Sequence, residues 1–379
     1  MTIPNPHPIL HLPSPLHRTA PVSFVLLLFL VVASPSEILG QATDPGPPAP
    51  PHSWSVEPLR AVVETAVRFE NGGIELAGTL HSPEGMVDGP AVVVVQQGGT
   101  TTRDNPIFRQ IAETFTGIGY SVLLYDRRGE GESGGEPGGR PDYLTLAEDA
   151  VAGKRRIAEL APVNPERIGY WGISQSGWIA MEAAVRSDPA FLMVVSSPLT
   201  TPGEQMEFLA HNYTLLAGHG EEAALEALSL RRKVAGEYFR GERSFESARQ
   251  LLEEAVDEPW FESTFLPLPD ELSRNVSESV WVGEMNYDPV AAFTEAGVPM
   301  LFVVGGEDFD FPVRRTLEIA AGLPDDDREI VVIPGASHVM RIEEDPRDQF
   351  ELSPEDASNA EAYFLVMGEW LGRLGLGSP

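Results

Sequence analysis

The sequence predicts an α/β fold in which a mostly parallel central sheet is flanked by helices and carries an inserted helical lid. Solid apolar runs alternate with longer amphipathic segments, a hairpin pattern precedes them, and one long interval has no strand pattern. Continuous Val, Ile and Leu runs are typical of strands buried on both faces of a parallel sheet. With 379 residues, 42% of them hydrophobic, the chain can form one large core.

The first element after the N-terminal segment is a predicted antiparallel hairpin. Residues 66–83, "AVRFENGGIELAGTLHSP", alternate apolar and polar residues on both sides of Asn71-Gly72-Gly73. Alternation of period two around an Asn-Gly turn is the pattern of two paired strands.

Repeated β-α units follow the hairpin. The buried strands are predicted at 91–96, 120–126, 167–173, 191–197, 299–305 and 329–335. Helical spacing of apolar residues falls at 107–117, 143–160, 177–187, 313–322 and 356–374. This order predicts a mixed, mostly parallel sheet between two layers of helices.

The interval from about 200 to 288 has helical rather than strand patterns, as in "EEAALEALSLRRKVAGEYF" and "SFESARQLLEEAV". An insertion between two strands of the sheet is expected to form a lid over one sheet edge. Its larger side chains suit either the lining of a substrate pocket or the lid's own core. They are Met206, Phe208, Tyr213, Leu215 and Trp260.

The N-terminus has the pattern of an export signal. Arg18 precedes the apolar run 24–33, and small residues end at Ala42, which predicts a signal peptide over 1–42. Residues 43–58 then form a proline-rich linker, and 59–379 the folded domain. An uncleaved membrane anchor is the alternative, although the run is shorter than the roughly 20 residues that span a bilayer. Cleavage predicts an exported protein, periplasmic or extracellular, without a stable membrane anchor.

Composition excludes several classes of protein. The formal charge of −31 repels phosphate backbones and anionic lipids, so no nucleic acid partner is expected. The chain has no cysteine, which removes disulfides, thiolate catalysis and thiolate-bound zinc. His7 and His11 are the one histidine pair at helical i, i+4 spacing, and they lie in the leader. A metal site is therefore not expected.

Ser174 is the candidate nucleophile. In "GISQSGW" the run 167–173 ends and a helical pattern begins, so Ser174 lies at a predicted strand-to-helix turn. A turn this tight needs small neighbours, which Gly172, Ser176 and Gly177 supply. Ser176 is the competing hydroxyl, but it lies a full step into the helix and lacks the glycine pattern that flanks Ser174.

A serine hydroxyl needs a base, and the base needs an orienting acid. Where a nucleophilic serine lies at a strand-to-helix turn of this kind, the three residues follow one another along the chain in the order serine, acid, histidine. His338 follows the last predicted strand and is the only histidine beyond the lid. Glu307, Asp308 and Asp310 all follow strand 299–305 and are candidates for the acid.

Two backbone N–H groups are candidates for binding an oxyanion. The N–H of Gln175 lies at a helix N-terminus, where donors lack intrahelical partners and the dipole favours negative charge. The loop "QQGGTTTRDN" after strand 91–96 offers the N–H of Gln97. A plain glycine turn remains the alternative for this loop.

These motifs together resemble the alpha/beta-hydrolase superfamily, in particular its bacterial carboxylesterase branch close to serine aminopeptidase-like hydrolases. The resemblance runs from about Val67 to Leu374 and includes "LAGTLHSPEG", "YDRRGEGESGG", "GISQSGWIA", "YDPVAAF", "GGEDFDFPV" and "GASHVM". Two departures are Gln96-Gln97 in place of the usual His-Gly and Ser176 in place of the last glycine of the turn.

The resemblance implies an alpha/beta-hydrolase fold and a triad of Ser174, Asp308 and His338, with Asp310 as the reserve acid. It also implies Gln97 and Gln175 as oxyanion donors and a small-molecule ester as substrate. The acyl-enzyme mechanism of such a triad needs no organic cofactor. The charged residues of "DRRGEGESGG" are expected to be structural. Two alternatives remain: an aminopeptidase or amidase with the same triad, and a noncatalytic binding module.

Overall fold

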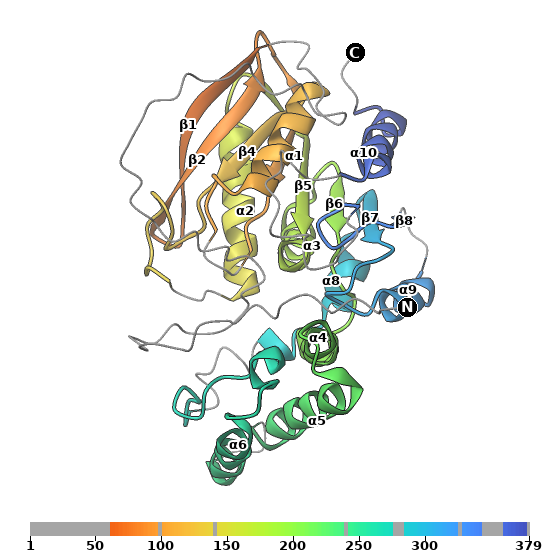
Figure 1. Ribbon diagram of the computed structural model, residues 1–379. Helices are drawn as coiled ribbons and strands as arrows, with labels where there is room; N and C mark the ends of the chain where they lie inside the picture. The colour runs from red at the N-terminus through yellow and green to blue at the C-terminus, as the bar shows by residue number, and fades with distance from the viewer. Residues whose placement is uncertain are drawn as a thin grey trace, which may run out of the picture.

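The computed structural model describes residues 61–97, 101–138, 142–238, 242–275, 284–324, 328–342 and 359–376. Their centre is an eight-stranded sheet in the order β1-β2-β4-β3-β5-β6-β7-β8 (Figure 1). The pairs β1–β2 and β2–β4 are antiparallel, and every other neighbouring pair is parallel. The predicted α/β fold with a mostly parallel sheet is confirmed.

The strands lie close to the predicted apolar runs. They are β1 Val62–Asn71, β2 Ile74–Pro83, β3 Gly89–Val94, β4 Ser121–Tyr125, β5 Val163–Ile173, β6 Leu192–Val195, β7 Met300–Gly305 and β8 Arg328–Ile333. The hairpin β1–β2 turns through Gly72 and Gly73, whose φ values of 60° and 78° explain why glycine occupies both positions.

Helices cover both faces of this sheet. They are α1 Pro106–Gly117, α2 Tyr143–Ile157, α3 Gln175–Ser187, α8 Pro289–Glu295, α9 Val313–Ala321 and α10 Glu361–Arg373. One hydrophobic cluster joins the sheet to α2, α3, α8 and α9, and a second joins it to α1 and α10. Val93 belongs to the first cluster and Val94 to the second, so β3 is buried on both sides, as its continuous apolar run predicted.

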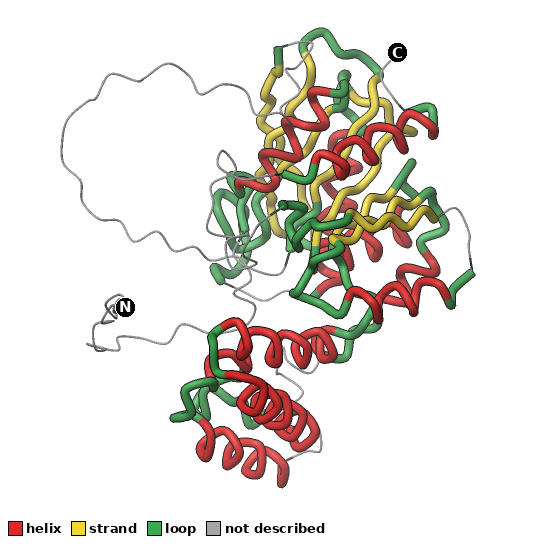
Figure 2. The backbone as a smooth tube through the Cα atoms, turned by 45° about the vertical axis from the view of Figure 1, so that its right-hand side comes forward, coloured by secondary structure: helices red, strands yellow, loops and turns green. Residues whose placement is uncertain are grey.

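The segment between β6 and α8 contains no strand among its described residues and is helical. It contains α4 Pro202–Leu216, α5 Gly220–Tyr238, α6 Glu242–Ala255 and the short 3-10 helix η1 Phe261–Thr264. These helices form a separate layer below the sheet in Figure 1, and Figure 2 shows them side by side beyond the ends of the strands. Trp260, Phe261 and Tyr238 belong to a hydrophobic cluster internal to this lid.

Two helices were not identified from the sequence. α8 is only seven residues long, and its signal was Asp288, whose carboxylate accepts a hydrogen bond from the N–H of Val290. α4 begins with a capping box formed by Thr201 and Glu204.

The predicted signal peptide, 1–42, and linker, 43–58, lie outside the described residues. In the described part of the chain, no helix combines the length and the apolar character needed to cross a membrane.

Candidate active site

Ser174 lies between the last residue of β5 and the first residue of α3. Its backbone has φ 54° and ψ −127°, a conformation that non-glycine residues rarely adopt. The main chain is held on two sides, because Ser174 N donates to Val195 O at 2.8 Å and Ser197 Oγ donates to Ser174 O at 2.6 Å. The turn therefore presents Ser174 at the carboxyl end of the sheet in a constrained conformation.

The small neighbours of Ser174 are required by close contacts with the backbone of Ser176 and the side chain of Ser197. A Cβ at position 172 would lie 2.3 Å from Ser176 O, and a Cβ at position 177 would lie 1.9 Å from Ser197 Oγ. Both distances are far below van der Waals contact. Glycine at 172 and 177 is thus the residue that this strand-to-helix turn can accommodate.

Ser176 is occupied by the turn itself. Its Oγ donates to Ile173 O at 2.8 Å and accepts from Ile173 N at 2.8 Å, and the residue is fully buried. These bonds close the turn in place of the glycine that the resemblance led us to expect. They also use the Ser176 hydroxyl, which leaves Ser174 as the nucleophile candidate of this turn.

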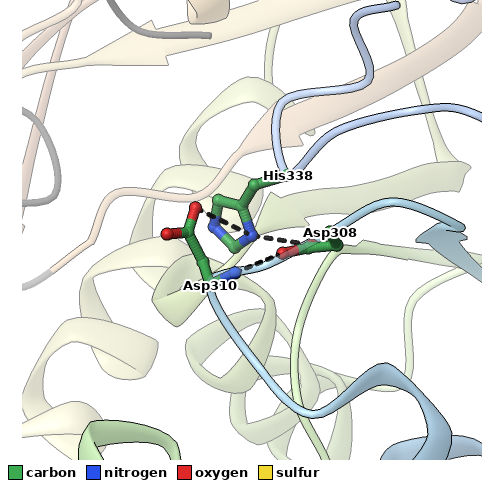
Figure 3. Close-up of side chains that lie close together, drawn as sticks. All are labelled: Asp308, Asp310 and His338. Atoms are coloured by element: carbon green, nitrogen blue, oxygen red, sulfur yellow. Dashed lines mark hydrogen bonds and ion pairs between the residues drawn. The ribbon is translucent and has the colours of Figure 1, made fainter. Parts of the chain in front are cut away.

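His338 and Asp308 are in direct contact. His338 Nδ1 and Asp308 Oδ2 are 2.8 Å apart, and both side chains are completely buried (Figure 3). Asp308 follows β7 and His338 follows β8, and the two strands are parallel neighbours. Their carboxyl ends therefore bring together two loops that are 30 residues apart in sequence.

Ser174 follows β5, which is separated from β7 by β6 alone. The register aligns Ile173 with Val195, and Val195 with Val303, so the carboxyl ends of these strands lie at one sheet edge. Ser174, Asp308 and His338 are all placed at that edge.

Asp310 is a second carboxylate near the same imidazole. Its Oδ2 lies 3.8 Å from His338 Nδ1, and its backbone N donates to Asp308 Oδ1 at 2.9 Å. Tyr213 of α4 donates its hydroxyl to Asp310 Oδ1 at 2.8 Å. The sequence identified Asp310 as a reserve candidate for the acid. Its contact with Tyr213 could be seen only in the three-dimensional structure.

Burial by itself lowers the pKa of His338, because it penalises the charged imidazolium. The negative charges of Asp308 and Asp310, together with the hydrogen bond from Asp308, outweigh burial and raise this pKa to about 9. Burial and the neighbouring carboxylates also raise the pKa of Tyr213, so its hydroxyl remains a donor.

Polar atoms of Asp308, Asp310 and His338 all lie within 4.8 Å of one another, which is close enough for residues of these types to share a cation. A cation between His338 Nδ1 and Asp308 Oδ2 would have to displace the proton that joins them at 2.8 Å. The contact is therefore a hydrogen bond in which the Asp308 carboxylate can orient the imidazole of His338.

The two candidate oxyanion donors lie on neighbouring strands. Gln97 follows β3 and is 6% exposed, and β3 pairs with β5, where Val95 N donates to Trp171 O at 2.9 Å. Gln175 is the first residue of α3, and its side chain donates to Tyr143 Oη at 3.1 Å. Residues 98–100, which continue the Gln97 loop, lie outside the described residues.

The lid residues singled out in the sequence have different surroundings. Met206 and Trp260 are packed in lid clusters, whereas Leu215 is 37% exposed. Phe208 lines an open cleft of about 580 Å³ together with residues of the Asp308 loop.

Two polar residues of α4 that were not predicted from the sequence contact the same loop. Gln205 and Asn212 donate to Asp310 O at 3.2 Å and to Phe309 O at 3.1 Å. Their i, i+7 spacing indicates that both lie on one helix face, but the sequence does not show which loop this face contacts.

Comparison with known proteins places the fold of this chain in one family. A family model described as "Alpha/beta hydrolase family" matches residues 106–351, more than half of the chain. The protein belongs to the alpha/beta hydrolase family.

Individual relatives match this chain over part of its length. An uncharacterized protein of Mycobacterium tuberculosis is 36% identical over 143 residues, which are 38% of this chain and 46% of that protein. The quorum-quenching protein AidA of Acinetobacter baumannii is 24% identical over 264 residues, 68% of this chain and 83% of AidA. The thiohydrolase aneE of Aspergillus aculeatus is 34% identical over 127 residues, 34% of this chain and 39% of that enzyme. The matches to the Mycobacterium and Aspergillus proteins thus span less than half of those proteins.

Solved structures show the same fold. An alpha/beta hydrolase from a Penicillium species superposes with a TM-score of 0.52 at 20% identity, covering 82% of this chain and 98% of its own. An esterase of Pyrococcus furiosus has a TM-score of 0.52 at 18% identity, covering 84% of this chain and 98% of its own. At these identities the similarity is one of fold.

Proposed function

We propose that this protein is a serine hydrolase that cleaves carboxylic esters through an acyl-enzyme. One observation carries the proposal: a fully buried Asp308–His338 pair lies at the same sheet edge as Ser174, whose backbone is held at positive φ before a helix N-terminus. Membership of the alpha/beta hydrolase family supports hydrolase activity, and an esterase is among the proteins with this fold.

In this mechanism His338 Nε2 removes the proton from Ser174 Oγ as the oxygen attacks the ester carbonyl. Asp308 accepts the hydrogen bond from Nδ1, which leaves Nε2 as the proton acceptor of the neutral imidazole and stabilises the imidazolium that forms. His338 then returns the proton to the leaving alcohol. A water molecule, deprotonated by the same imidazole, hydrolyses the acyl-enzyme and regenerates Ser174.

Negative charge develops on the carbonyl oxygen during both steps. The backbone N–H of Gln175 is in the first turn of α3, where the helix dipole favours an anion. The N–H of Gln97 is the proposed second donor, reached from the adjacent strand β3. Loss of a donor of this kind slows acyl transfer by about 100-fold or more in known cases.

Labelling with a fluorophosphonate tests the nucleophile, because the reagent phosphonylates an activated serine. We expect stoichiometric labelling of the wild-type protein, and loss of labelling and of ester turnover to near background in Ser174→Ala and in His338→Ala. Ser187→Ala is the matched control and should retain labelling, since its hydroxyl donates to Ala183 O at the other end of α3. A wild-type protein that is folded but unreactive would indicate a noncatalytic binding module instead.

The bond that is cleaved is tested with two substrate series. We expect Ser174-dependent turnover of p-nitrophenyl esters of several acyl lengths and much slower turnover of aminoacyl anilides. Thioesters belong in the same panel, because a relative carries the name thiohydrolase. Comparable turnover of the anilides would make the protein an aminopeptidase or amidase with the same triad.

We further propose that residues 1–42 direct export and are then removed, on the basis of the basic residue and apolar run at the N-terminus. Expression of the full chain in a bacterial host with separation of periplasm, medium and membrane checks this. Mature protein beginning near residue 43 in a soluble exported fraction is the expected result. Full-length protein in the membrane fraction would support the uncleaved anchor.

A further inference from the structure

Two carboxylates, rather than one, face the same nitrogen of the candidate base. Asp308 Oδ2 lies 2.8 Å and Asp310 Oδ2 lies 3.8 Å from His338 Nδ1 (Figure 3). All three side chains are completely buried. Placing two carboxylates this close together in the interior is unfavourable unless positive charge or hydrogen bonds compensate. A second buried carboxylate beside this imidazole therefore indicates a function for Asp310.

The second carboxylate is held by the lid and not by the sheet domain alone. Tyr213 Oη donates to Asp310 Oδ1 at 2.8 Å, and Gln205 Nε2 donates to Asp310 O at 3.2 Å. Asn212 Nδ2 donates to the carbonyl of the preceding residue, Phe309, at 3.1 Å. The positions i, i+7 and i+8 of α4 share one helix face. A single face of α4 therefore binds the loop after β7 that carries Asp308 and Asp310, which we call the acid loop.

The two carboxylates have different geometry. Asp308 is within hydrogen-bonding distance of Nδ1 and can fix the tautomer of His338. Asp310 is 1 Å further from Nδ1 (3.8 Å against 2.8 Å), so its effect on the ring is that of a buried charge. Tyr213 sets where that charge lies, because its hydrogen bond restrains the opposite oxygen of the same carboxylate.

We propose that Asp310 is a second positioning carboxylate for His338 and that Tyr213 holds it there, so that the seating of lid helix α4 sets the electrostatics of the candidate base. The proposal rests on the proposed function for its catalytic meaning. Its physical content is a charge effect of Asp310 on His338 that depends on a lid side chain.

The proposal has a direct consequence for proton transfer. The groups that act on His338 include Asp308 and Asp310 from the loop after β7. Tyr213 of α4 is bonded to Asp310, and the ring of Phe311 packs against the imidazole. Asp310 favours the imidazolium that forms when Ser174 is deprotonated. The same charge keeps a larger fraction of the free protein protonated and inactive at neutral pH.

The first experiment measures protonation of His338 without relying on catalysis. The imidazole is titrated by NMR in the Ser174→Ala protein, with its resonance assigned by loss in His338→Gln. We expect Asp310→Asn to lower the titration midpoint by about one pH unit or more. Glu307→Gln is the matched control, because it removes an exposed charge from the same loop and should shift the midpoint by less than about 0.3 unit.

An unchanged midpoint in Asp310→Asn, or an equal shift in Glu307→Gln, would overturn the proposal. Should Asp310→Asn not fold, Asp310→Ser removes the same charge with a smaller side chain. Because this titration uses a protein without its nucleophile, it decides the effect of Asp310 even if the wild-type protein proves unreactive. Failure of the proposed function is seen separately, as absence of fluorophosphonate labelling.

The second experiment tests Tyr213 through its dependence on Asp310. Labelling is measured at about pH 10, where His338 is neutral, so that only its ability to accept the proton is compared. We expect Tyr213→Phe to slow fluorophosphonate labelling at least about threefold when Asp310 is present and less than about twofold in Asp310→Asn, since contacting residues are coupled. Tyr238→Phe is the control, because it removes a lid hydroxyl that donates to Ser273 O at 2.9 Å, away from the acid loop. Equal slowing by Tyr213→Phe in both backgrounds would show that Tyr213 only stabilises the lid.

Discussion

Ser174 has a backbone conformation that serine adopts only when its surroundings impose it. A strained residue of this kind costs about 1–3 kcal/mol, which the surrounding packing has to supply. Here Gly172 allows the chain to pass within 2.3 Å of where a Cβ would be, and Ser176 closes the turn with two hydrogen bonds. The position of the nucleophile is therefore a property of its neighbours as much as of Ser174.

Gly172→Ala is expected to damage the turn, because the added methyl group meets the backbone of Ser176 and cannot move aside. We expect a loss of about 2–3 kcal/mol in the free energy of unfolding and loss of fluorophosphonate labelling. Denaturant unfolding and active-site titration measure both. Gly368→Ala in α10 is the control and should be neutral or stabilising, since among the described residues outside its own stretch of helix no atom lies within 4 Å of its Cβ position. Full labelling of Gly172→Ala would contradict the role given to Gly172.

The pKa of about 9 for His338 predicts an alkaline pH profile. A general base must be neutral to accept a proton, so kcat/KM for an uncharged ester should rise with pH and level off above about 9. Stopped or continuous ester assays across pH 6 to about 10 check this. A profile that is already flat at neutral pH would show that the imidazole is not held protonated in the free protein.

The same pKa has a consequence for stability. Because the pKa of His338 is raised on folding, the protonated ring stabilises the folded state fully below its usual value of 6.5, and this contribution is lost as pH rises through about 9. The opposite trend would apply if burial alone acted on His338. Activity and stability of this site therefore have opposite pH dependences.

Helix α4 is the element that joins the lid to the acid loop, and its N-terminus is capped by Thr201. The Thr201 hydroxyl accepts from Glu204 N at 3.2 Å, and Glu204 Oε2 accepts from Thr201 N at 3.0 Å. Pro202, at the first helical position, suits a helix start because its missing N–H has no intrahelical partner there. The start of the lid is thus specified locally.

Thr201→Ala should loosen α4 specifically. Loss of an N-cap costs about 1 kcal/mol, which corresponds to roughly fivefold faster amide exchange in the first turns of the helix. Hydrogen exchange read by mass spectrometry measures it. Asn105→Ala, which removes the equivalent cap of α1, is the control and should leave α4 unchanged. Unaltered exchange in α4 of Thr201→Ala would mean that packing against the acid loop, rather than the cap, holds this end.

At the scale of the whole molecule, Asp149 joins three segments that are distant in sequence. It lies in α2, accepts from Asn71 Nδ2 at 2.8 Å at the end of β1, and accepts from Arg128 Nε at 2.7 Å after β4. Its side chain is buried, and Arg128 is mostly buried. This arrangement supports the expectation that the charged residues of "DRRGEGESGG" are structural.

Asp149→Asn should destabilise the whole domain. Removing one partner of a buried ion pair leaves Arg128 uncompensated, and the expected loss in the free energy of unfolding is about 3 kcal/mol. Denaturant titration measures it. Glu318→Gln, from the exposed pair with Arg314, is the control and should cost less than about 0.5 kcal/mol. Similar small losses in both variants would show that Arg128 finds another partner or solvent.

Local patterns were sufficient for most of the sheet and for the helices that flank it. Apolar runs predicted the strands because a strand buried on both faces must be apolar at successive positions, and the glycines around Ser174 pointed to a tight turn. The short helix α8 was missed because seven residues carry little periodicity. Helix α4 was missed because its buried face includes polar residues that bind the acid loop, such as Gln205.

The glycine pattern around residue 174 made Ser174 the candidate nucleophile, and chain order then favoured His338 and restricted the acid to three carboxylates. The family resemblance favoured Asp308 among the three. The contact of Asp310 with Tyr213, 97 positions apart, could not be read in the same way. A periodic pattern reports which face of an element is buried, since burial depends on the element's own repeat. Which loop that face meets depends on how sheet and lid pack together, and only the three-dimensional arrangement contains that information.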